Sequence, residues 1–266
     1  MSGLFVQARL TVRRAMASRM VLAVVLLALL ILALTSVGLT VVVEEGTSSS
    51  VRSEGVMVLF ALLAGGLGNF VALVLGATLV RTDLREGTIL SVLSKPISRW
   101  AYVVGSYGGS VLFLMLVWGI FVLLFLGLAY VLEVEVTRTH AWILLGRVLL
   151  ALVLLSTAFF FSLFTSAWVA AALALIVYYG DSFAALLASL LRPVVGTVSE
   201  RTRALLGYPF PATDRLDFLY GMLSGQLLDT PAVGLLFLHL ADYAAVMLAL
   251  AVWVFERKDI GPGLES

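Results

Sequence analysis

The chain has 266 residues, of which 62% are hydrophobic and 12% are charged, and its formal net charge is +1. Soluble domains contain about 45–50% apolar and about 25% charged residues, so this composition excludes an ordinary soluble domain. The near-neutral charge argues against a nucleic-acid partner, because such a partner requires a basic surface. The chain has no cysteine, which excludes disulfides, thiolate metal sites and a cysteine nucleophile. A mean hydropathy of +1.11 therefore predicts an all-α polytopic membrane protein.

Residues 1–19 form the first predicted element, an amphipathic helix. Leu4, Phe5, Ala8 and Val12 face one way, and four arginines are interleaved with them. Such a basic helix can lie in the lipid headgroup layer. A second interpretation, a basic flank that only sets the orientation of the first span, fits the same residues equally well.

Long uncharged segments follow, and a helix needs about 20 apolar residues to cross about 30 Å of hydrocarbon. We predict six transmembrane helices in a single domain covering residues 1–266, at about 20–43, 56–80, 100–132, 139–161, 166–180 and 232–255. Only Arg147 interrupts residues 139–180, so this region is also compatible with one overlong helix.

The distribution of charge favours six spans. With the N-terminus inside, the cytoplasmic side receives ten of the seventeen Lys and Arg residues, namely Arg9, Arg13, Arg14, Arg19, Arg81, Arg85, Lys95, Arg99, Arg257 and Lys258. Positive residues concentrate on the cytoplasmic side of membrane proteins. We therefore predict a multi-pass protein of the cytoplasmic (inner) membrane with both termini inside and an extracytoplasmic insert at 181–230. One helix over 139–180 would instead place the basic C-terminal tail outside.

A polar stretch, "REGTILSVLSKPISRW", separates the second and third predicted spans at residues 85–100. Thr88 can cap a short helix, because its hydroxyl can accept a hydrogen bond from a free backbone N–H. Pro96 ends that helix, since the residue before a proline is driven out of the α region. The pattern predicts a short amphipathic helix at 83–96 on the cytoplasmic surface. An ordinary interfacial connector is the simpler alternative.

The order of residues in this stretch resembles the cytoplasmic signature of type-2 ATP-binding-cassette (ABC) transporter permeases, a family that includes permeases of the nitrous-oxide-reductase-maturation type. The usual signature has an acidic residue before Gly-Thr, a leucine-rich turn and Pro-x-x-Arg. The matching residues here are Arg85, Glu86, Gly87, Thr88, Leu90, Leu93, Pro96 and Arg99. The basic N-terminus, the six predicted spans and the tail at 255–259 extend the resemblance. The family usually has a basic residue soon afterwards, and residues 105–109 contain none.

The resemblance implies that 83–96 is a coupling helix seated on a soluble ABC ATPase. The chain has no Gly-Lys pair, so it cannot form the usual phosphate-binding loop. We therefore expect no enzymatic activity and no cofactor in this chain, with ATP and Mg bound by the partner ATPase. A second permease copy, identical or related, would complete a transporter that exports a substrate. The alternative is a non-transporting anchor or a subunit that transmits force to an extracytoplasmic partner.

Four polar residues within predicted spans are further candidates, because such groups are costly in hydrocarbon. Asn69 can bond across helices or touch substrate, and Arg147 can extend its guanidinium to the outer surface. His239 and Asp242 share one face of the last span, where a proton relay, a structural hydrogen bond or an Arg147–Asp242 pair is conceivable. No metal site is predicted, since the chain has only two histidines. The insert at 181–230 is either a binding surface for an extracytoplasmic protein or a plain surface loop.

Overall fold

The computed structural model describes residues 2–44, 49–85, 98–131, 133–180, 182, 210–211 and 230–257. All the elements in these ranges are helices, which confirms the predicted all-α class. They are α1 (Ser2–Ala17), α2 (Arg19–Glu44), α3 (Ser49–Arg85), α5 (Arg99–Val131), α6 (Arg138–Ser162), α7 (Ala167–Tyr178) and α11 (Thr230–Arg257). Within the described residues, four segments are long and apolar enough to cross a membrane, namely Leu59–Thr78, Arg99–Val131, Arg138–Ser162 and Val233–Arg257. The chain thus has the character of a membrane protein.

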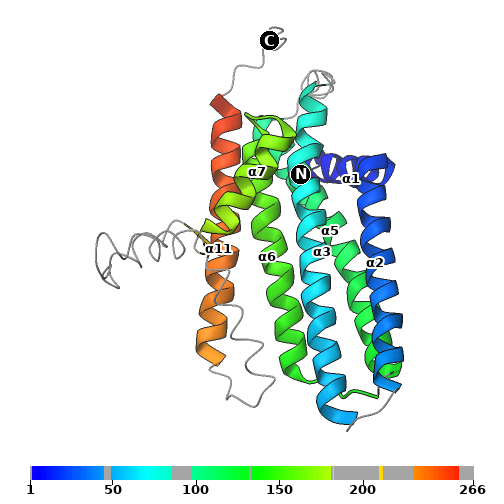
Figure 1. Cartoon of the computed structure of the whole chain (residues 1–266). Coiled ribbons are helices and arrows are strands. Elements are labelled where there is room, and N and C mark those ends of the chain that lie inside the picture. Colours follow the sequence, from blue (N-terminus) through cyan, green and yellow to red (C-terminus); the bar gives the residue numbers. More distant parts are fainter. Residues whose placement is uncertain are drawn as a thin grey trace, which may run out of the picture.

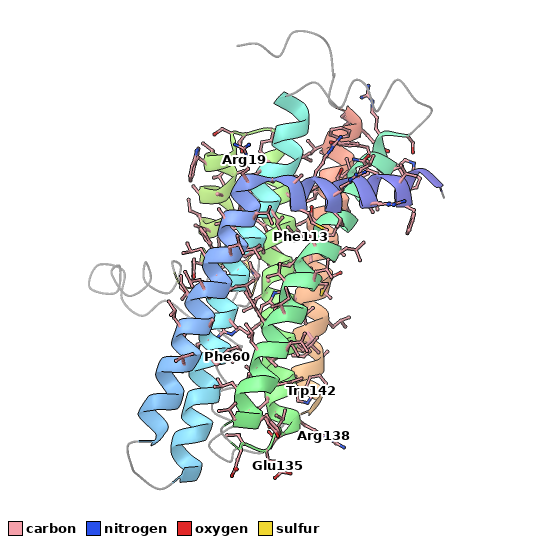
Figure 2. The ribbon with its side chains drawn as sticks, turned by 90° about the vertical axis from the view of Figure 1, so that its right-hand side faces the viewer. Arg19, Phe60, Phe113, Glu135, Arg138 and Trp142 are labelled. Carbon is pink, nitrogen blue, oxygen red and sulfur yellow. The ribbon has the colours of Figure 1, made fainter. Side chains whose placement is uncertain are left out.

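The five longest helices, α2, α3, α5, α6 and α11, run side by side as a bundle, and α1 lies across one end of it (Figure 1). We call this end the basic end, because it carries α1 with its arginines, the end of α3 at Arg85, the start of α5 at Arg99 and the end of α11 at Arg257. Figure 2 shows Arg19 at the basic end and Glu135 and Arg138 at the opposite end.

The centre of the bundle is the contact of α3 with α5 and α6. Phe60 and Leu75 of α3 are buried with Trp118 and Phe121 of α5 in one apolar cluster. Gly76 permits the closest approach of α3 to α6, because a Cβ atom there would lie 2.6 Å from the carbonyl oxygen of Leu155. Small residues allow helix backbones to approach in this way in membrane proteins. Gly65, Gly68 and Gly76 of the second predicted span therefore allow close packing, whereas Gly66 faces open space.

The region 139–180 contains two helices. α6 ends at Ser162, a turn covers 163–166, and Ser166 is the N-cap of α7. α7 has 12 residues, about 18 Å of helix at 1.5 Å per residue, which is shorter than the predicted element at 166–180 and than the hydrocarbon layer of about 30 Å. It starts at the basic end and reaches only part of the way along the bundle (Figure 1).

The predicted spans at 20–43, 56–80, 139–161 and 232–255 lie inside longer helices, and the span at 100–132 matches α5 except for residue 132, which lies outside the described residues. The span at 56–80, for example, falls within α3, which begins at Ser49 and ends at Arg85. Most of the predicted helix at 83–96 and of the insert at 181–230 lies outside the described residues.

Candidate functional site

The site predicted from the family signature lies at the basic end, between the last residue of α3 and the first of α5. Arg85 ends α3 and Arg99 begins α5, so the two ends of the signature flank a connection made at this end of the bundle. The signature residues between them, Glu86, Gly87, Thr88, Leu90, Leu93 and Pro96, lie outside the described residues.

Arg99 contacts the end of α11. Its Nη1 donates a hydrogen bond to the carbonyl oxygen of Glu256 at 3.2 Å. The last carbonyls of a helix have no partner within the helix, and a cation there also interacts favourably with the helix dipole. Arg99 therefore caps α11 from the start of α5. Sequence reasoning assigned Arg99 to the coupling segment alone and missed this contact inside the chain.

Aromatic packing strengthens the same junction. Tyr102 of α5 stacks on Phe255 of α11 with ring centroids 5.6 Å apart, and both side chains are fully buried. The guanidinium of Arg257 lies 4.2 Å from the ring centroid of Trp253, a cation–π distance. The start of α5 and the end of α11 are thus held together by a polar cap and a buried aromatic pair.

α1 docks on α5 next to this junction. Nε2 of Gln7 donates a hydrogen bond to Oγ of Ser106 at 3.0 Å, and Gln7 and Thr11 are both buried. A Cβ atom on Gly109 would lie 2.6 Å from the carbonyl oxygen of Ala8, so the helices are almost in backbone contact. Gly109 therefore permits the close approach of α1 to α5.

The buried face of α1 differs from the predicted one. Gln7, Thr11 and Ala15 face the bundle, whereas Phe5 is 74% exposed. The spacing of these three residues is a helical repeat of four, but a search for apolar residues overlooks it. Arg9 and Arg13 point away from the bundle and are exposed. α1 therefore combines a bundle contact made by small and polar residues with an outward face that is both apolar and basic.

A second polar position lies near the middle of the bundle. Nδ2 of Asn69 on α3 donates a hydrogen bond to the hydroxyl of Tyr178 at 2.8 Å, and Tyr178 is the last residue of α7. This is the bond across helices that the sequence predicted as one role of Asn69. Oδ1 of Asn69 is buried without a hydrogen-bond partner. The short helix α7 thus ends beside a polar group of the central helix.

Arg147 lies close to this position. Its side chain packs on Gly65, where a Cβ atom would meet Cδ of Arg147 at 2.6 Å. Gly65 and Asn69 are four residues apart and so share one face of α3, about 6 Å apart along its axis. Arg147 and the Asn69–Tyr178 bond therefore occupy neighbouring levels of the same α3 face.

His239 and Asp242 lie on the outer side of α11. Both are exposed on α11, while the neighbouring residues Leu236, Leu240 and Ala244 pack against α6. The structure therefore does not bring Asp242 and Arg147 together, because Arg147 faces α3. Among the described residues, no group of three or more His, Cys, Asp or Glu side chains gathers into a metal-binding arrangement.

The described part of the insert returns to the end of α7. The ring of Phe210 packs directly against Gly180, and Pro211 is buried. Any side chain at 180 would collide with this ring. Phe210 therefore packs at the point where α7 stops.

Comparisons with known proteins identify no family for this chain, since no family model and no curated protein matches it.

Proposed function

We propose that this chain is the membrane-spanning permease subunit of an ABC transporter in a cytoplasmic membrane. ATP would be hydrolysed by a separate ATPase docked on residues 83–99, and a second permease copy would complete the transporter. The observation that carries this proposal is the position of the signature. Residues 86–98 connect the two central helices α3 and α5, and Arg99 at its end caps α11.

The basic end fits the cytoplasmic side. Its arginines on α1, α3, α5 and α11 contrast with the opposite end, where Glu44, Glu54, Glu133 and Glu135 outnumber Arg52 and Arg138. Because basic residues concentrate on the cytoplasmic side of membrane proteins, the N-terminus, the signature and the end of α11 would all face a soluble cytoplasmic partner.

The packing suggests how movement would spread through the bundle. A force applied to residues 86–98 acts directly on the ends of α3 and α5. The Arg99 cap and the Tyr102–Phe255 stack would carry α11 along with α5, and the Gln7–Ser106 bond would carry α1. The end of α6 belongs to the same junction, because Phe159 and Leu163 pack with Tyr102 and Phe255, so the helices that meet at the basic end would move as one unit. Interfaces that are packed in this way shift between discrete arrangements rather than deforming continuously.

Photo-crosslinking tests the docking. A photoreactive amino acid is placed at Ser91 or Ser94, within the signature, in the full chain produced in its own host. The matched control is the same amino acid at Ser49, which begins α3 at the opposite end of the bundle. We expect both signature positions, and not Ser49, to capture a protein that mass spectrometry identifies as an ABC ATPase. Capture only at Ser49, or of proteins without an ATPase domain, would contradict the proposal.

Coupling is then tested on the purified complex with that ATPase in lipid vesicles. Glu86→Ala removes the acidic residue of the signature, and we expect ATP turnover to fall about tenfold, the effect of losing roughly 1.4 kcal/mol of coupling. Glu54→Ala at the opposite end is the control and should leave turnover unchanged. Unchanged assembly and turnover in the Glu86 variant would refute the role of the signature.

A further inference from the structure

One face of α11 carries a regular seam of exposed residues. Its members are Leu235, His239, Asp242, Val246, Ala249 and Trp253, all exposed in the single chain. They are separated by four, three, four, three and four residues. This alternation is the heptad spacing by which one helix packs along another. We call these six residues the α11 seam.

The two ionisable members of the seam lie at membrane depth. Asp242 is about 18 Å along the helix axis from Thr230 and about 22 Å from Arg257. The hydrocarbon layer is about 30 Å thick, so a spanning α11 places Asp242 inside it, with His239 less than one turn away. Ionisable side chains at this depth face a protein interior or a water-filled cavity, and they pair with other polar groups.

The helices that the structure describes do not provide such a partner. The opposite side of α11 makes its contacts with the bundle, through Val233, Leu240 and Ala251 among others. Within the described part of the chain, His239 and Asp242 make no hydrogen bond or ion pair. Apolar seam residues could face lipid without cost, but this pair could not. The seam therefore needs a polar partner that lies outside these helices.

We propose that the α11 seam binds the α11 seam of a second copy of this chain. The seam is complementary to itself, because imidazole can donate a hydrogen bond and a carboxylate can accept one. Two copies inserted in the same orientation are related by a two-fold axis along the membrane normal, which pairs α11 with its counterpart in parallel. Positions three residues apart are about 4.5 Å apart along the axis, so His239 of each copy can reach the partner's Asp242.

The rest of the seam suits this pairing. Ala249 leaves space for close approach of two helices, and Leu235 and Val246 supply apolar contacts on either side of the polar pair. An isologous contact uses the same patch on both subunits, so each seam residue meets its own counterpart near the axis. This contact would hold together the two copies that the proposed transporter requires. It depends on neither the signature nor an ATPase.

Disulfide cross-linking in membranes tests the seam directly, and the chain is suited to it because it has no cysteine. Val246→Cys places a thiol on the seam. Ala241→Cys is the control, since it is also exposed, lies about 7.5 Å from Val246 along the axis of α11 and is off the seam. On oxidation we expect Val246→Cys to form a dimer of twice 28.5 kDa, at least tenfold more than Ala241→Cys. Equal cross-linking of the two variants, or an adduct of Val246→Cys with another protein alone, would overturn the proposal.

Charge exchange within the seam supplies an independent test in the Val246→Cys background. His239→Asp gives the paired seams four carboxylates and no donor, and Asp242→His gives them four imidazoles. We expect His239→Asp to lower dimer cross-linking about five- to tenfold, as two membrane hydrogen bonds are lost, and Asp242→His to lower it less, because a neutral imidazole can both donate and accept. The double variant, which exchanges the two residues, restores the complementary pair and should recover most of the cross-linking. A double variant as weak as the single ones would refute the pairing. Because these experiments need no ATPase, their failure is distinguishable from failure of the proposed function.

Discussion

The central helix α3 and the outer helix α11 both carry polar groups among apolar residues, but they place these groups differently. In α3, 61% of the most apolar window is buried, against 28% in α11. The polar group of α3, Asn69, bonds to Tyr178 inside the chain. The ionisable pair of α11 faces outward. Among the described residues, the polar group of α3 is therefore paired within the chain, whereas His239 and Asp242 on the outer face of α11 are not.

The largest loss of stability is expected from a substitution that disrupts the contact of α3 with α6 at the centre of the bundle. Gly76→Leu would force α3 away from α6, because even a Cβ atom at this position lies 2.6 Å from a backbone oxygen and 2.8 Å from Cβ of Ala158. Overpacking against backbone costs about 3 kcal/mol. Thermal unfolding in detergent micelles, followed by circular dichroism, measures the loss. Gly66→Leu is the control, since no atom lies within 4 Å of a Cβ there, and it should be neutral. Equal effects of the two changes would mean that α3 and α6 do not pack as described.

A smaller effect is expected where α1 meets α5. Gly109→Leu would displace α1, whose Ala8 carbonyl oxygen lies 2.6 Å from the position of a Cβ atom. We expect a loss of about 2 kcal/mol and faster tryptic cleavage at Arg9 and Arg13, as α1 is released. Gly108→Leu is matched in helix and depth and has open space at its Cβ position. If both variants were cleaved at the rate of the unmodified chain, α1 would not depend on this contact.

The helical class and most helix positions could be predicted from the sequence because hydropathy controls them directly. Even the end of α7 at Tyr178 lies only two residues before the predicted end at 180. One feature could not be predicted. The docking face of α1 consists of Gln7, Thr11 and Ala15, which a search for apolar stripes ignores, since their fit depends on the missing side chain of Gly109.

The candidate site also combines features that residue order predicts with contacts that it does not predict. The resemblance to the permease signature rests on residue order alone and stays a prediction, whereas the bond across helices, one of the two roles predicted for Asn69, is present in the structure. The contact of Arg99 with Glu256 joins residues 157 positions apart, and no local pattern encodes it. The Arg147–Asp242 pair failed as an expectation because it assumed facing sides of α6 and α11. The helix faces are set by glycine packing, which turns Arg147 toward Gly65.

A third prediction concerns the hydrogen bond between Asn69 of α3 and Tyr178 of α7. Asn69→Leu and Tyr178→Phe each remove one partner, and the double variant removes both. The interaction energy from this double-mutant cycle should be about 0.6 kcal/mol, the average for side-chain hydrogen bonds between membrane helices. Unfolding in micelles again provides the measurement. Strict additivity of the two single effects would show that the bond does not contribute to stability.

The smallest effect is expected on the outer face of α11. Asp242→Leu should change the stability of the dilute, monomeric chain in micelles by no more than about 0.5 kcal/mol, as for surface positions without structural partners. Ala241→Leu, one residue away and also exposed, should behave in the same way. A loss as large as that of Asn69→Leu would mean that Asp242 has a partner within its own chain, and α11 would then resemble α3. A near-zero change in the monomer, together with loss of seam cross-linking in membranes, would instead locate the contribution of Asp242 in the contact between two copies.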